Sequence, residues 1–184
     1  MDRSQFLEFL DGLGEAERLA LYNNTDRVAT LATQLVVEAG SAFTLKLERK
    51  PGIIAQLKRD AAYEGYVEKQ INDDRYPTTP GGIVDVRYRI VRGEELKRAD
   101  GYVYRSDVEA RFRDMRMRFP DAAEALLPPA RDRNVGRGDK PYVAFICGSQ
   151  GAFFVGERGG QRRLRLNTRD DDWYASCAFV GVCE

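Results

Sequence analysis

The region from residue 141 to residue 184 carries the most regular hydrophobic pattern of the chain. Short apolar runs alternate there with glycine-rich segments, which is typical of antiparallel strands joined by tight turns. We therefore predict a β-meander over 141–184, with hairpin turns at 148–151 and 157–160. Two of its runs, 142–147 and 174–182, are apolar at nearly every position. This predicts that both of their faces are buried and that they lie at the centre of the sheet.

Two earlier segments alternate between apolar and polar residues with a period of two. Residues 43–48 and 83–91 therefore predict half-buried strands, each with one face toward the core. Residues 101–105 predict a short companion strand for 83–91. Residues 73–82 are rich in Asp, Thr, Pro and Gly, and they predict an exposed loop that is the longest candidate for a mobile or functional segment.

Apolar residues at helical spacing predict the helices. One of them begins at a Ser106-x-x-Glu109 capping box, and another is expected to end at Pro128. The predicted helical regions are a pair of amphipathic helices within 1–40, a helix over 51–72, one over 107–119 and a short one over 121–127.

Helices early in the chain and strands late predict an α+β fold, with N-terminal helices packed on a mainly antiparallel sheet. A length of 184 residues suits a single domain. Within it we distinguish a helical N-terminal region (1–40), a mixed region (41–140) and the β-meander (141–184).

Charge is balanced over the whole chain, with 29 basic and 29 acidic residues. The balance argues against nucleic acid or an anionic membrane as the partner. No apolar run is long enough to span a membrane, and the first residues, Met1–Gln5, lack the basic and apolar stretches of a signal peptide. We therefore expect a cytoplasmic protein. The cations are mostly arginine, which is suited to forked recognition of carboxylates and phosphates.

Histidine is absent from the sequence. Its absence removes His-activated serine and cysteine nucleophiles and every zinc site that contains histidine. The three cysteines, Cys147, Cys177 and Cys183, are too few for a four-thiolate site and are expected to be buried packing residues. The sequence therefore predicts no cofactor and no metal, and it favours a non-catalytic role.

One enzymatic alternative depends on carboxylates. Glu64 and Glu68 on the predicted helix over 51–72, together with Asp85 on the predicted strand over 83–91, could hold a divalent metal that activates water, as in a nuclease or a nucleotide-acting enzyme. Arg87 occupies the position where such sites usually carry a lysine, and it cannot accept a proton. An exposed polar face on a half-buried strand explains Asp85 equally well.

The leading hypothesis is a protein-binding module, such as an accessory, assembly, inhibitor or immunity-type protein. A helical projection of 107–119 places Met117 on the exposed face among arginines, including Arg113 and Arg116, which is a composition enriched at protein interfaces. The acidic run Asp170, Asp171 and Asp172 is either a solvated turn or a second partner-binding loop. The partner would be another protein, either a different chain or a second copy.

A third hypothesis is nucleic-acid binding without catalysis. Arg163 and Arg165 alternate with leucines on a strand that should have one solvated face, near Tyr and Trp residues. Such a face resembles platforms on which bases stack. The adjacent aspartates and the zero net charge argue against it.

Overall fold

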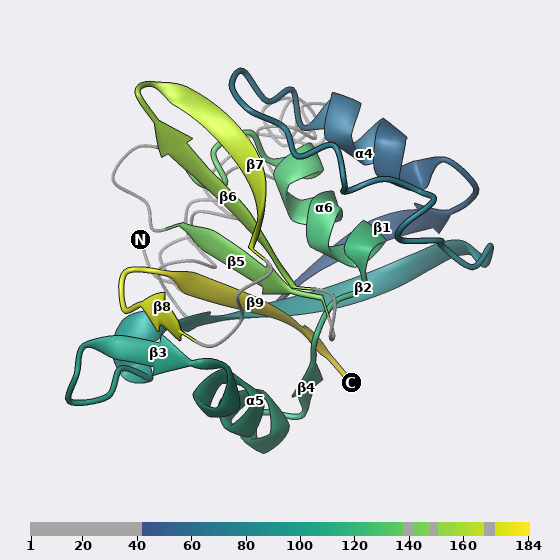
Figure 1. The fold of residues 1–184 in the computed structure, drawn as a ribbon. Helices are drawn as coiled ribbons and strands as arrows, with labels where there is room; N and C mark the ends of the chain where they lie inside the picture. The colour runs from purple at the N-terminus through teal and green to yellow at the C-terminus, as the bar shows by residue number, and fades with distance from the viewer. Residues whose placement is uncertain (1–41, 138–141, 148–150, 168–171) are drawn as a thin grey trace, which may run out of the picture.

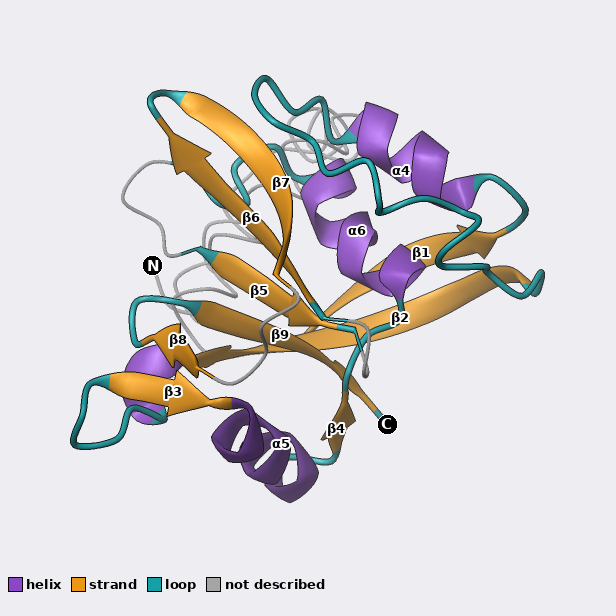
Figure 2. Cartoon of the chain, in the orientation of Figure 1, coloured by secondary structure: helices purple, strands orange, loops and turns teal. Residues whose placement is uncertain are grey.

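The computed structural model describes residues 42–137, 142–147, 151–167 and 172–184. The predicted N-terminal helices therefore lie outside the described residues. The described part combines three α-helices with a large, curled and mostly antiparallel sheet (Figure 1, Figure 2). This is an α+β arrangement, with helices and strands mixed along the chain.

The main sheet has seven strands, and they do not follow the order of the sequence. Neighbouring strands are antiparallel except for β9 and β5, which run parallel. Across the sheet the order is β1 (Phe43–Arg49), β2 (Gly82–Arg92), β9 (Ala178–Cys183), β5 (Val143–Ile146), β6 (Ala152–Arg158) and β7 (Gln161–Asn167), with β4 (Met117–Arg118) also beside β9.

Strands β1 and β2 confirm the prediction from alternation. Leu47, Val86 and Tyr88 are buried, whereas Lys46 and Asp85 on the intervening positions are exposed. Successive side chains of a strand point to opposite faces, so one face of this pair joins the core and the other meets solvent.

The predicted meander is confirmed in its first three strands. β5, β6 and β7 form consecutive antiparallel pairs. Gly159 and Gly160 close the β6–β7 turn with φ angles of 63° and 72°. Positive φ at both central residues defines a type I′ turn, whose twist matches that of the flanking strands.

The apolar run after β7 is not a fourth strand of the meander. A turn interrupts it, in which the N–H of Cys177 donates to the carbonyl of Tyr174 (3.0 Å) and the N–H of Gly93 donates to the carbonyl of Cys177 (2.8 Å). The first part, β8 (Asp172–Tyr174), pairs with β3 (Tyr102–Tyr104) in a separate two-stranded sheet, so β3 is not a companion of β2. The second part, β9, lies between β2 and β5, and the predicted central position of β5 and β9 is confirmed.

The helices are α4 (Ile53–Asp60), α5 (Arg105–Asp114) and α6 (Ala122–Arg131), with a 3₁₀ turn η1 (Gly93–Glu95). The prediction that α4 extends to residue 72 is wrong. The segment after Asp60 hydrogen-bonds instead to the edge of β7: the N–H of Glu68 donates to the Leu164 carbonyl (3.0 Å), and the N–H of Leu164 donates to the Tyr66 carbonyl (2.9 Å).

Helix α5 ends earlier than predicted, at Asp114. Arg116 takes a left-handed conformation with φ of 52°, which turns the chain into β4. Met117 then pairs with Cys183 and is only 5% exposed. The prediction that Met117 lies on the exposed face of a helix is therefore wrong.

The start of α5 also differs from the prediction. The carboxylate of Asp107 accepts a hydrogen bond from the backbone N–H of Tyr104 (3.2 Å), and α5 begins at Arg105. Because Ser106 lies inside the helix, the predicted capping box of Ser106 and Glu109 is wrong.

Helix α6 continues through Pro128 and Pro129 to Arg131, although it was expected to end before them. A proline inside a helix has no N–H to donate to the carbonyl four residues earlier. For Pro128 that carbonyl belongs to Glu124, and it accepts a hydrogen bond from the buried hydroxyl of Tyr88 (2.9 Å). The sheet thus satisfies a group that the proline leaves free, and the helix can continue.

The predicted loop over 73–82 is irregular but anchored. The carboxylate of Asp73 accepts hydrogen bonds from the backbone N–H groups of Ile54 and Ala55 (3.1 Å each), at the start of α4. Tyr76 is buried and packs edge-on against Phe153, with ring centroids 5.1 Å apart. Side chains from this loop are therefore part of the folded body.

The sheet separates two hydrophobic cores. On one face, α4 and α6 cover residues from β1, β2, β9, β5, β6 and β7, including Leu47, Tyr88 and Phe153. On the other face, α5 and the β3–β8 pair cover a smaller core that includes Phe112 and Phe179. Figure 1 shows the two groups of elements on opposite sides of the sheet.

A fully buried arginine holds the helix side of the sheet together. The Arg162 side chain is 0% exposed and donates to four backbone carbonyls: Ala61 (2.6 Å), Pro129 (2.8 Å), Val135 (2.8 Å) and Asp132 (3.4 Å). Its guanidinium also lies 4.9 Å from the ring centroid of Tyr63. Burial lowers the pKa of Arg162 from its ordinary value, while the charge of the Tyr63 phenolate would raise it. A β7 side chain thereby joins the ends of α4 and α6.

A buried glutamate fixes the other end of α6. Glu124 is 1% exposed and accepts hydrogen bonds from Arg118 (2.7 and 2.8 Å), Arg49 (2.7 Å) and the backbone N–H of Asp121 (2.9 Å). Burial alone would raise the pKa of Glu124, yet these hydrogen bonds and the arginine charges hold it below the ordinary value. The cluster links β1, β4 and the start of α6.

We predict that Arg162→Leu lowers the free energy of unfolding by about 3–5 kcal/mol, because it leaves buried carbonyls unsatisfied at about 1–3 kcal/mol each. Urea unfolding measures the loss. Arg158→Leu, an exposed arginine of the same hairpin, is the matched control and should change stability by at most about 0.5 kcal/mol. Equal effects of the two substitutions would contradict the role of Arg162.

A second prediction concerns acid. Since the pKa of Glu124 lies below the ordinary value of 4.5, the unfolded chain binds this proton first. The stabilisation is therefore complete above about pH 4.5 and is lost as pH falls through the lower folded pKa. Urea unfolding from about pH 3 to pH 7 should show a smaller loss in Glu124→Gln than in the unchanged protein. Glu48→Gln, at an exposed carboxylate of β1, should leave the pH dependence unaltered.

Candidate functional site: an arginine–aromatic groove

The sheet face opposite α4 and α6 is covered in its middle and open at both ends, and the two ends differ in charge. At the β1–β2 end, Lys46 lies directly opposite Asp85 in the register, so these exposed charges compensate each other. At the β6–β7 end, Arg165 lies opposite Phe154 and Arg163 lies opposite Gly156. These cross-strand pairs place no carboxylate beside either arginine.

A groove of about 490 Å³ lies over this second end, between β6, β7 and β8. We call it the arginine–aromatic groove. It is lined by Tyr142, Phe154, Gly156, Arg158, Arg163, Arg165, Leu166, Asn167, Asp172, Trp173, Tyr174 and Cys177.

The strand pattern places the floor of the groove. Phe154 and Gly156 on β6 share the open face with Arg163 and Arg165 on β7, because cross-strand partners point to the same side. The ring of Tyr142 lies directly against Gly156, where a Cβ atom would overlap its Cδ1 and Cε1 atoms. Glycine at this position lets the tyrosine ring lie flat against the sheet.

The opposite wall comes from the two-stranded sheet. Trp173 is only 3% exposed and packs edge-on against Phe179, with ring centroids 5.3 Å apart. Its neighbour Tyr174 is 69% exposed and lies 5.7 Å from the ring of Tyr102 across the β3–β8 pair. One aromatic residue therefore anchors the wall in the core while the next one presents its ring to solvent.

Electrostatically, the groove is rich in donors. None of Arg158, Arg163 and Arg165 forms an ion pair with a carboxylate of the described residues, and Asp172 is the one carboxylate in the lining. The Nε atom of Arg163 and the Nε1 atom of Trp173 are buried and have no hydrogen-bond partner within the described part of the chain. The Arg163 Nε atom packs against Gly65 at the edge of β7, where a Cβ would lie 2.9 Å from it, and Trp173 is in the core. The exposed arginines that can donate to a ligand in the groove are Arg158 and Arg165.

The lining contains one thiol, that of Cys177, and it is a poor nucleophile. Burial raises the pKa of Cys177 to about 11, against a smaller lowering by the hydrogen bond with the Tyr174 backbone. The thiolate is the nucleophilic form, so Cys177 stays protonated near neutral pH. Cys147 is buried as well, and burial likewise raises its pKa.

The predicted partner-binding residues fall in two places. Asp172 lines the groove, whereas Asp170 and Asp171 lie outside the described residues. Arg113, Arg116 and Met117 come together at a different, open pocket of about 380 Å³.

At that second pocket Met117 is buried, and only the two arginines of this set are exposed. Glu109 and Glu184 belong to the same lining, so carboxylates lie close to Arg113 and Arg116. In the groove, Asp172 is the one carboxylate among the described lining residues. The rings of Tyr142 and Tyr174 are also more exposed than that of Phe112 in the second pocket. We therefore consider the groove the stronger candidate site.

The structure does not bring the three carboxylates of the metal alternative together. Asp85 is exposed on β2, and Glu64 lies beyond β7, where it binds the side chain of Arg137. That hydrogen bond holds the pKa of Glu64 below its ordinary value. Glu68 accepts from the Tyr66 hydroxyl (2.8 Å). Within the described ranges no group of three Asp, Glu, Cys or His side chains could hold a metal ion.

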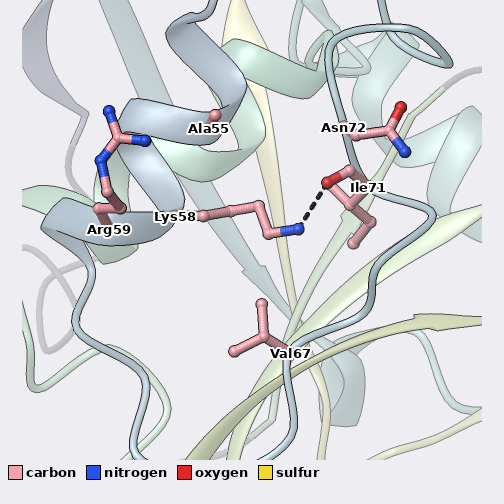
Figure 3. A pocket seen from close by; sticks show the side chains of 6 residues that line it. All are labelled: Ala55, Lys58, Arg59, Val67, Ile71 and Asn72. Atoms are coloured by element: carbon pink, nitrogen blue, oxygen red, sulfur yellow. Dashed lines mark hydrogen bonds between the residues drawn. The ribbon is translucent and has the colours of Figure 1, made fainter.

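A pocket of about 330 Å³ beside α4 contains the half-buried side chain of Lys58 (Figure 3). The amine of Lys58 points across the pocket and donates to the carbonyls of Ile71 (2.7 Å) and Glu68 (2.8 Å). Burial lowers the pKa of Lys58, against the opposing charges of Glu68 and Asp73. Because two of its three N–H donors are bound to the backbone, Lys58 mainly ties the segment after α4 to the helix.

Sequence analysis identified Arg163, Arg165 and Asp172 but missed Tyr142, Phe154 and most of the remaining lining. The strand over 142–147 was predicted, but its first residue gave no sign that it would lie over Gly156. The signal that could have found Phe154 is the register of the predicted 157–160 turn. A two-residue turn at Gly159 and Gly160 places Phe154 opposite Arg165.

Comparison with protein-family models, with curated proteins and with solved structures finds no match to this chain. Among the described helices, none is both long and apolar enough to cross a membrane.

We predict that Gly156→Ala displaces the Tyr142 ring and lowers the free energy of unfolding by about 1–3 kcal/mol. In a Tyr142→Ala background the same change should cost less than about 1 kcal/mol, because the obstructing ring is gone. A double-mutant cycle by urea unfolding measures the coupling. Gly81→Ala is the control, since a Cβ there meets its nearest atoms, in Arg49 and Thr79, at ordinary distances of 3.5 Å and beyond. Additive effects would show that the ring does not lie on Gly156.

Proposed function

We propose that the protein is a non-catalytic binding module and that the arginine–aromatic groove is its protein interface. The observation that carries the proposal is that, within the described residues, the arginines at one end of the open sheet face have no carboxylate as cross-strand partner. Arg163 and Arg165 lie opposite Gly156 and Phe154, whereas Lys46 and Asp85 at the other end lie opposite each other.

The residue types of the groove support a protein partner. Tyrosine, tryptophan and arginine are the residues most enriched among those that dominate binding energy at protein interfaces. Tyr142 and Tyr174 are 45% and 69% exposed, and both line the same groove as the arginines. A partner that covers these exposed rings removes apolar surface from water, which stabilises the complex.

The chemistry of the lining favours binding over catalysis. Cys177 remains a thiol, the arginines cannot accept protons, and the sequence contains no histidine to activate a nucleophile. The arrangement can orient and desolvate anionic and aromatic groups, which is what recognition requires.

The test uses a photo-reactive phenylalanine analogue at position 174, in the full chain expressed in its native host. We expect a crosslink to a defined partner from position 174 and none from position 83, where Ile83 is 71% exposed but lies on β2 far from the groove lining. Arg165→Glu should reduce the crosslink by about tenfold or more, as at an interface residue worth about 1.4 kcal/mol or more.

Arg87→Glu, an exposed arginine at the other end of the same sheet face, is the matched control and should leave the crosslink intact. Thermal unfolding of each variant checks that the fold is retained. Equal labelling from positions 83 and 174, or labelling that survives Arg165→Glu, would refute the groove as the interface.

A further inference from the structure

We propose that the groove binds an extended, acidic protein segment whose carboxylates alternate with uncharged residues. This inference rests on the proposed function and adds the chemistry of the partner. It follows from three features: the spacing of the arginines, the donor-rich lining, and the carboxylates at the borders of the groove.

The arginines form a row along the open face. Arg163 and Arg165 are two residues apart on β7, and Arg158 lies opposite Gln161, two residues before Arg163. Alternate residues of a strand lie about 7 Å apart on the same face. An extended segment has the same repeat, so carboxylates at every second position would meet successive guanidinium groups.

The lining offers such a segment two kinds of contact, hydrogen bonds to its carboxylates and apolar surface for the residues between them. Guanidinium groups bind carboxylates through two parallel hydrogen bonds, which are among the stronger contacts that proteins make. Phe154 and Tyr142 supply apolar surface beside the arginines. A segment with one aromatic or aliphatic residue between its carboxylates could cover that surface.

The borders of the groove favour a short anionic stretch over a continuous polyanion. Asp172 lies in the lining, and Glu157 lies next to Arg158 and 3.9 Å from Arg137. Glu64 and Glu68 lie along the outer edge of β7. A nucleic-acid backbone that followed the row of arginines would approach these carboxylates, whereas a peptide can place uncharged residues there.

The test compares three probes bound to the full chain. The first is a peptide in which glutamates alternate with threonines around one tyrosine, the second is its glutamine counterpart, and the third is a short oligothymidylate. Binding is followed by the NMR shifts of the Arg165 and Tyr174 amides, which detect weak complexes. We expect the glutamate peptide to bind at least about tenfold more tightly than either other probe, with an affinity that falls as salt is added.

Arg165→Glu should weaken the glutamate peptide about tenfold or more, and Arg87→Glu should leave it unchanged. Equal binding of the glutamate and glutamine peptides, tighter binding of the oligothymidylate, or no shift of either amide would overturn the inference. The crosslinked partner gives an independent readout through the sequence of its labelled segment. A neutral or basic segment crosslinked from position 174 would refute the acidic partner while leaving the proposed function standing.

Discussion

The fold depends on a cation in the middle of the protein. A buried guanidinium without hydrogen-bond partners would be prohibitively costly, and Arg162 meets this demand by donating to carbonyls of Ala61, Pro129 and Val135. These carbonyls come from the ends of α4 and α6 and from the loop that follows α6. Each of them would otherwise be a backbone acceptor that folding removes from water. The donors of one β7 side chain and the carbonyls of three separate backbone segments therefore satisfy each other. These hydrogen bonds fix the positions at which the helices contact the sheet.

The same strand divides structural and functional roles between its faces. Arg162 and Leu164 point toward the helices and are fully buried, whereas Arg163 and Arg165 point the other way and line the groove. The period of two that defines a strand thus assigns neighbouring arginines to opposite tasks. The rigid attachment of β7 through Arg162 gives the groove a fixed floor, and pre-organised surfaces lose less conformational entropy when they bind.

The sequence patterns predicted correctly those elements that depend on residues close together in the sequence. The strands over 43–48 and 83–91 and the β5–β7 meander follow from alternation and from glycine, and the structure confirms them. The turn predicted at 157–160 is present and is confined to Gly159 and Gly160. Errors arose where distant partners decided the outcome. Helix α6 passes Pro128 because Tyr88, far away in sequence, satisfies the freed carbonyl. Likewise, Met117 is buried because it lies on β4, beside β9, with its side chain packed over Gly181, and a helical projection of 107–119 carries no information about that strand. Arg163 and Arg165 could be identified from sequence, as a possible nucleic-acid-binding face, but Arg158 and the tyrosine that covers Gly156 could not.

The place of β9 has a consequence for how the molecule can assemble. It is the latest described strand in the sequence, yet β2 lies on one side of it and β5 on the other, so it connects the β1–β2 pair to the β5–β7 meander. Until residues 178–183 have been synthesised, the two halves of the sheet have no shared strand and each exposes an unpaired edge. Contacts this distant in sequence close slowly because of the chain entropy they cost. A ribosome-bound intermediate would therefore hold two separate groups of strands, and loss of this one strand would split the sheet in two.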